Sequence, residues 1–185
     1  MKNKFKIICI LLLPFTIFLI GCGTSPLTMK VNDSNAFSSS KSILVSDFST
    51  EGATINYEGN ADSLGHVLAV LIQKELQKKA GQLKVFLEND ESNNADLIIE
   101  GGFTKIDEGD ATARVMVAQE GVLILLDGVI KNPDGKVVAN FNVNKESAGG
   151  PLGMGGLLAG DSDVIIENLM EEIAEELSDF IIAQM

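Results

Sequence analysis

The chain has 185 residues, 45% of them hydrophobic and 22% charged, and a formal net charge of −12. A chain of this length can form one domain with a substantial core. Its acidic surface repels nucleic acid, so we expect no nucleic-acid partner and favour a basic protein or cations. The chain has no Trp and a single Tyr, which argues against an aromatic platform for sugars.

The first 21 residues have the pattern of a lipoprotein signal peptide. Lys2, Lys4 and Lys6 precede an apolar run over residues 7–20, and residues 19–22 read Leu-Ile-Gly-Cys, a lipobox. The run has fourteen residues. An uncleaved spanning helix, the alternative, needs about 20. We therefore expect cleavage before Cys22 and attachment of lipid to its thiol, which anchors the protein to a membrane.

Cleavage would leave 11 basic and 26 acidic side chains, a net charge of −15. Cys9 would be lost with the signal, so no disulfide could form. Gly23 is not the aspartate that retains lipoproteins in the inner membrane of Gram-negative cells. We therefore expect the outer membrane, with the domain facing the periplasm.

Residues 22–40 are predicted to be the lipidated cysteine and a flexible tether, because Ser, Asn and Thr dominate them. A single globular domain is predicted for residues 41–185. It begins with a strand within 41–49. A helix follows from Asp62 or Ser63 to about Ala80, because apolar residues recur there at spacings of three and four.

Strands are predicted next for residues 83–87 and 96–106, with a bulge at Gly101-Gly102. Further strands are predicted for 111–119 and for 122–131, which is apolar almost throughout and therefore central. The Asn-Pro-Asp-Gly turn at 132–135 leads into residues 137–144, where apolar and polar residues alternate. This pattern indicates an antiparallel meander with one face on the core and one in water.

An uncharged Gly-rich loop covers residues 149–160, and it lacks the lysine and serine of a nucleotide-binding loop. Its apolar residues either pack on the core or contact a partner or the bilayer; they are Leu152, Met154, Leu157 and Leu158. A terminal helix begins at Asp161 or Ser162 and carries its apolar residues, Phe180 among them, on one face. Its acidic face is either solvated or docks a basic partner through Glu171, Glu172, Glu175 and Glu176.

The order of these elements is β-α-β, then further strands, then a final helix. It predicts an α+β fold, with two helices on one face of a largely antiparallel sheet. For chemistry the sequence offers little. His66 is the only histidine, and no nucleophile elbow or set of zinc ligands is present. We therefore expect no catalytic residue, no metal and no cofactor. A buried polar pocket around His66 would instead favour a periplasmic hydrolase.

Several of these motifs come in a familiar order: the strand Ile43-Leu44-Val45-Ser46-Asp47-Phe48, the first helix, residues 95–101, Arg114, the turn at 132–138, the Gly-rich loop and the acidic helix. In this order the chain resembles the bacterial lipoproteins of the domain of unknown function 4410 family. The resemblance implies an envelope location and a compact α/β domain, similar in layout to periplasmic domains of curli-secretion and TolB-type proteins. It implies no catalytic residues.

The sequence thus favours a membrane-anchored envelope lipoprotein that acts through contacts with an envelope protein. The alternative is a subunit of a curli-secretion-like export channel, an idea that depends on similarity of layout.

Overall fold

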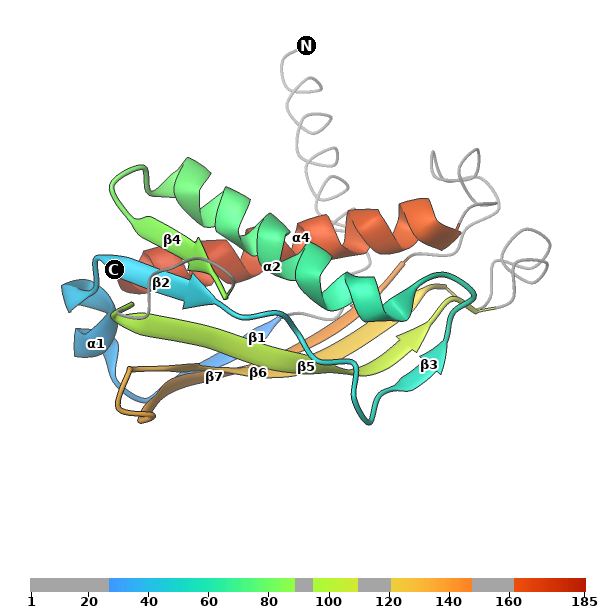
Figure 1. Ribbon diagram of the computed structural model, residues 1–185, viewed down its shortest axis with the longest axis horizontal. Coiled ribbons are helices and arrows are strands. Elements are labelled where there is room, and N and C mark those ends of the chain that lie inside the picture. The colour runs from blue at the N-terminus through green and yellow to red at the C-terminus, as the bar shows by residue number, and fades with distance from the viewer. Residues whose placement is uncertain (1–26, 89–94, 110–120, 148–161) are drawn as a thin grey trace, which may run out of the picture.

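The computed structural model describes residues 27–88, 95–109, 121–147 and 162–185. These residues form an open sheet of seven strands and three helices, so the predicted α+β fold is confirmed (Figure 1). Helices α2 (Ala61–Lys79) and α4 (Ser162–Gln184) contact each other and lie on the same face of the sheet. No helix in these ranges is long and apolar enough to cross a membrane.

The sheet has the order β1 (Thr28–Val31), β7 (Val137–Glu146), β6 (Leu123–Lys131), β5 (Leu97–Asp107), β2 (Ser42–Val45) and β4 (Lys84–Leu87), and β3 (Thr54–Asn56) also pairs with β5. The long strands pair antiparallel, as predicted for the meander. The short strands β2, β3 and β4 run parallel to their neighbours. Helix α2 makes this possible, because a parallel pair needs a long crossover connection between β2 and β4.

The predicted turn at 132–135 is confirmed by Gly135, whose φ is +82° and whose N–H donates to the carbonyl of Asn132 at 2.9 Å. The predicted bulge lies further along β5, where the register shifts between Phe103 and Lys105. Gly101 and Gly128 serve packing instead: a Cβ on the first would meet the ring of Phe48, and one on the second would meet the ring of Phe141.

The prediction of a flexible tether is wrong for residues 27–40. They form β1 and a short helix, α1 (Ser34–Ser39), and both Leu27 and Phe37 are buried in the core. Asp33 caps α1 and binds the Lys136 ammonium group at 2.7 Å, which ties the segment to the β6–β7 turn. The serine-rich composition predicted a flexible segment. Two buried apolar side chains are nevertheless enough to hold so short a segment on the domain.

The core lies between the helices and the inner face of the sheet. The ring of Phe48 packs there against those of Phe103 and Phe141, with centroids 6.5 and 6.4 Å away. Most apolar residues predicted for the terminal helix are buried, but Phe180 is 40% exposed. The strand predicted at 111–119 and the loop at 149–160 lie outside the described residues.

Candidate functional site

The candidate site lies on the side of the sheet that faces away from α2 and α4, which we call the outer face. No described helix or strand lies over it (Figure 1). Alternate residues of each strand point to it, and the strand register places them in rows that cross the sheet. One row joins Lys30, Asn140, Val129 and Glu100, from β1 to β5.

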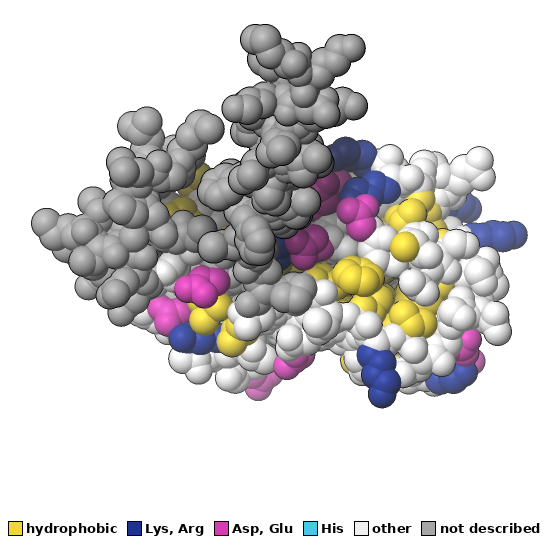
Figure 2. Space-filling view, turned by 180° about the vertical axis from the view of Figure 1, so that it is seen from behind, with side chains coloured by type: hydrophobic (Ala, Val, Ile, Leu, Met, Phe, Trp, Pro, Cys, Tyr) yellow, Lys and Arg dark blue, Asp and Glu magenta, His cyan; other side chains and the backbone are white. Residues whose placement is uncertain are grey.

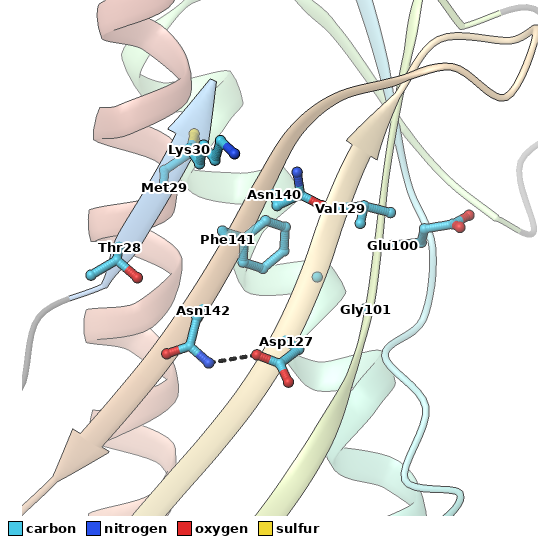
Figure 3. A pocket seen from close by; sticks show the side chains of 11 residues that line it. Thr28, Met29, Lys30, Glu100, Gly101, Asp127, Val129, Asn140, Phe141 and Asn142 are labelled. Atoms are coloured by element: carbon cyan, nitrogen blue, oxygen red, sulfur yellow. Dashed lines mark hydrogen bonds between the residues drawn. The ribbon is translucent and has the colours of Figure 1, made fainter. Parts of the chain in front are cut away.

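A groove of about 800 Å³ follows these rows across β1, β7, β6 and β5. Figure 3 shows the polar side chains that line it, and the amide of Asn142 donates to the carboxylate of Asp127. Thr28, Lys30, Glu100 and Asn140 complete the polar lining. Hydroxyl, amide, carboxylate and ammonium groups thus share one surface, which suits recognition by hydrogen bonds.

Beside the groove the outer face is apolar. Its large apolar side chains are all partly buried and come from four strands: Leu44, Phe86, Ile98, Leu123, Leu125 and Val129. Leu44 lies between Phe86 and Ile98 in the parallel pairs of β2 with β4 and β5. A sheet face that meets only water carries mostly polar side chains. The outer face is more apolar than that.

Charges on the outer face balance. Four basic and four acidic residues occupy it: Lys30, Lys84, Lys105, Lys131, Glu100, Asp107, Asp127 and Glu146. Two pairs are formed within the chain, Lys131 with Glu100 at 2.6 Å and Lys105 with Asp107 at 2.8 Å. Lys105, the side-chain amide of Asn56 and the Gly109 N–H together lower the pKa of Asp107 from 3.8 to about 2.

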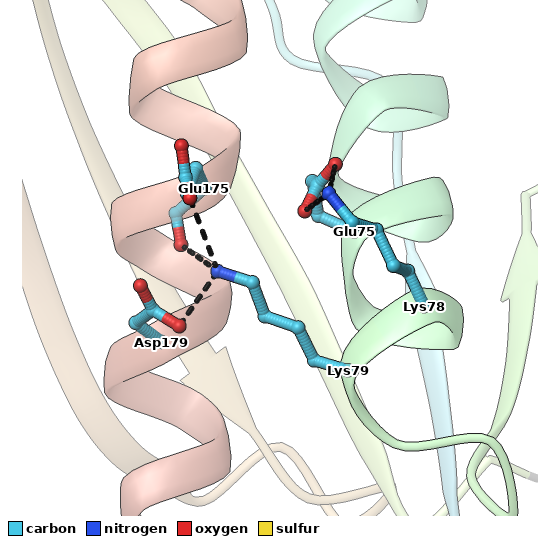
Figure 4. Close-up of polar contacts among 5 residues, drawn as sticks. All are labelled: Glu75, Lys78, Lys79, Glu175 and Asp179. Carbon is cyan, nitrogen blue, oxygen red and sulfur yellow. Dashed lines mark hydrogen bonds and ion pairs between the residues drawn. The ribbon is translucent and has the colours of Figure 1, made fainter.

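The helix layer is different. Helix α4 carries seven acidic residues and no Lys or Arg. Lys79 of α2 binds the Asp179 carboxylate at 2.6 Å and the Glu175 backbone carbonyl at 3.1 Å (Figure 4). In the view from behind, acidic and basic side chains lie next to one another in the upper part, with exposed hydrophobic side chains below (Figure 2).

A buried lysine ties α4 to the sheet. Lys145 points inward from β7 and its side chain is only 1% exposed. Its ammonium group lies 2.5 Å from the Glu176 carboxylate and 3.4 Å from that of Glu172. The carboxylates are 40% and 54% exposed, so they neutralise the lysine from the rim of the core.

The acidic face of α4 is engaged within the chain, and its role as a contact for a partner stays a prediction. Three of its four predicted contact residues already serve the fold: Glu172 and Glu176 bind Lys145, and Glu175 lies 4.0 Å from Lys79. Only Glu171 makes no ion pair among the described residues. Cys22 and the predicted contact residues Leu152, Met154, Leu157 and Leu158 lie outside the described residues.

His66 does not sit in a buried pocket. Its side chain is 50% exposed on α2, and its Nδ1 lies 3.0 Å from Asp47. Neither residue lines the groove. In the described ranges, no group of three or more His, Cys, Asp or Glu side chains is arranged to hold a metal ion.

The sequence reading missed Asp127, Asn140 and Asn142 as neighbours. The alternation in 137–144 correctly placed the asparagines on the wet face. The Lys131-to-Val137 turn then brings them opposite β6, because residues paired across a hairpin share a face.

The model of the family described as Domain of unknown function (DUF4410) matches residues 43–151. The chain belongs to this family. Among solved structures, the PelC dodecamer from Paraburkholderia phytofirmans is 10% identical with a TM-score of 0.51, covering 82% of this chain and 98% of that one. A variant of that dodecamer from the same organism is 11% identical with a TM-score of 0.49, covering 83% and 98%. The TM-score of 0.51 shows that this chain and PelC share a fold. No curated protein matches the chain.

Proposed function

We propose that this DUF4410 protein is an outer-membrane lipoprotein, anchored through Cys22 with its domain in the periplasm. It acts by protein contacts in the cell envelope and not by catalysis, and it works as an assembly of copies. The observation that carries the assembly is the outer face of the sheet, which combines partly buried apolar side chains with a groove and balanced charge.

Three observations support this role. A sheet face that carries apolar side chains and has no described layer over it is typical of a protein contact surface. The structural neighbour PelC was solved as a dodecamer, which favours assembly for a chain of the same fold. The lipobox ending at Cys22 supports the anchor, since stable attachment needs more than one acyl chain and bacterial lipoproteins carry two or three.

The anchor is tested by labelling cells with a radioactive or clickable fatty acid. Cys22→Ala should abolish incorporation and leave the uncleaved precursor, whereas the matched variant Cys9→Ala should be labelled and processed normally. Label retained by Cys22→Ala would refute the lipidation site. Fractionation of labelled cells then tests for the outer membrane.

Assembly is tested on the full-length protein extracted in mild detergent, by light scattering that corrects for bound detergent. A defined oligomer supports the proposal. A monomer at the protein concentration found in the outer membrane would reject it.

A second candidate function is a subunit of an export channel, favoured by the dodecameric state of PelC. Planar-bilayer recordings of the purified oligomer separate the two functions. Reproducible unitary conductance would support the channel, and a stable oligomer without conductance would leave the contact module.

A further inference from the structure

We propose that the outer face of the sheet is where two copies of this chain pack against each other, sheet to sheet. The inference rests on the proposed function, because it names the contact surface of the proposed assembly. It uses only the described residues of β1 to β7.

The first step comes from the two sides of β6. Ile124, Leu126 and Ile130 point inward and are fully buried. Leu123, Leu125 and Val129 point outward and are only partly buried. A strand with one face in water alternates apolar and polar residues, as β7 does, whereas a strand covered on both faces is apolar throughout. Three of the five outward positions of β6 are apolar, and the other two are Asp127 and Lys131. The apolar positions are more than a face that only meets water requires, so they favour a second layer over β6, and the described part of the chain supplies none.

The second step is electrostatic and identifies the occupant. Two copies that met through α4 would bring together two helices with seven acidic residues each. Lys79 and Lys145 neutralise part of this charge within each copy, but α4 itself supplies no base. Like charges brought together at an interface are repelled. The outer faces instead carry four bases and four acids each, so they can meet without a net repulsion, although the whole chain has a charge of −12.

The third step is complementarity. Within the described residues, Lys30 and Lys84 make no ion pair, and neither do Asp127 and Glu146. A two-fold contact sets each face against the same face of the other copy. Bases of one copy can then meet acids of the other, while the apolar side chains of β6 fill the centre. Aligned packing of two sheets through such faces is a common arrangement.

The test compares two lysine substitutions in the full-length protein. Val129→Lys places a charge in the middle of the outer face. Inside one copy it lies across from Glu100, so the fold should tolerate it. Phe180→Lys makes the same change at a 40% exposed position on α4. We expect Val129→Lys to weaken self-association at least tenfold and Phe180→Lys to leave it unchanged, with both variants giving the circular dichroism of the wild type.

A second measurement does not depend on stability. Asn140→Cys on the outer face and Glu171→Cys on α4 are treated in intact cells with a flexible bismaleimide. Asn140→Cys should give a cross-linked dimer and Glu171→Cys should not. The inference would be overturned if Val129→Lys left the oligomer intact, or if Asn140→Cys cross-linked a different protein. Either result would still be compatible with assembly through another surface. A monomeric wild type would instead reject the proposed function.

Discussion

Lys145 allows a sharp test of how the helix layer is held on the sheet. Its side chain is 1% exposed, and its ammonium group pairs with Glu176 at 2.5 Å and with Glu172 at 3.4 Å. Glu176→Gln removes the closer carboxylate and leaves the farther one. A hydrogen bond to a charged group contributes about 1.5–3 kcal/mol. Because the Glu176 side chain is 40% exposed and Glu172 remains, we expect a smaller loss of about 1–2 kcal/mol.

The assay is a double-mutant cycle measured by thermal unfolding at neutral pH. For a domain of this size, about 1–2 kcal/mol corresponds to a fall in Tm of roughly 3–6 °C. In a Lys145→Met background, where an apolar chain of similar length replaces the lysine, Glu176→Gln should change the Tm by less than about 1 °C, because the interaction is already gone. Glu171→Gln is the matched control and should be neutral in both backgrounds. An equal effect of Glu176→Gln with and without Lys145 would refute the reasoning.

Three other changes test the fold. Phe37→Ala should lower the free energy of unfolding by about 3 kcal/mol, because Phe37 is 0% exposed. Ser38→Ala in the same helix should have almost no effect. Equal effects of the two changes would indicate that this segment is a flexible tether after all. Gly65→Ala should destabilise by at least about 2 kcal/mol, since its Cβ would strike the carbonyl oxygen of Phe48, and Gly81→Ala, which meets nothing within 4 Å, should be neutral or slightly stabilising. The pKa of Asp107 is lowered to about 2, so its contribution is complete above pH 3.8 and disappears as the pH falls towards 2. The difference between wild type and Asp107→Asn in urea unfolding should accordingly be about 1–2 kcal/mol at pH 6 and vanish near pH 2, and a difference that persists there would contradict it.

Periodicity carried most of the fold prediction. The spacing of apolar residues located α2 and α4, and the alternation in 137–144 located β7 and its wet face. These signals succeed because burial on one side imposes a fixed repeat on a regular element. They fail for β1 and α1, because a segment of four to six residues is too short to show a repeat.

The candidate site was harder to predict because it is made of pairs that are distant in sequence. Asp127 and Asn142 are fifteen positions apart, and Lys145 is more than twenty positions from both Glu172 and Glu176. The sequence predicted that the acidic helix face is either solvated or docks a partner, because nothing local shows that a lysine from a strand projects inward beneath it. The apolar length of β6 did carry a signal, and it correctly indicated a central strand.

The early start of the folded domain limits how this protein can sit on a bilayer. Leu27, already in the core, is five positions after Cys22, and a fully extended chain covers at most about 17 Å over that distance. If Cys22 carries the proposed acyl chains, the start of β1 near Thr28 must lie close to the lipid headgroups. The domain then has little freedom to reorient above the membrane.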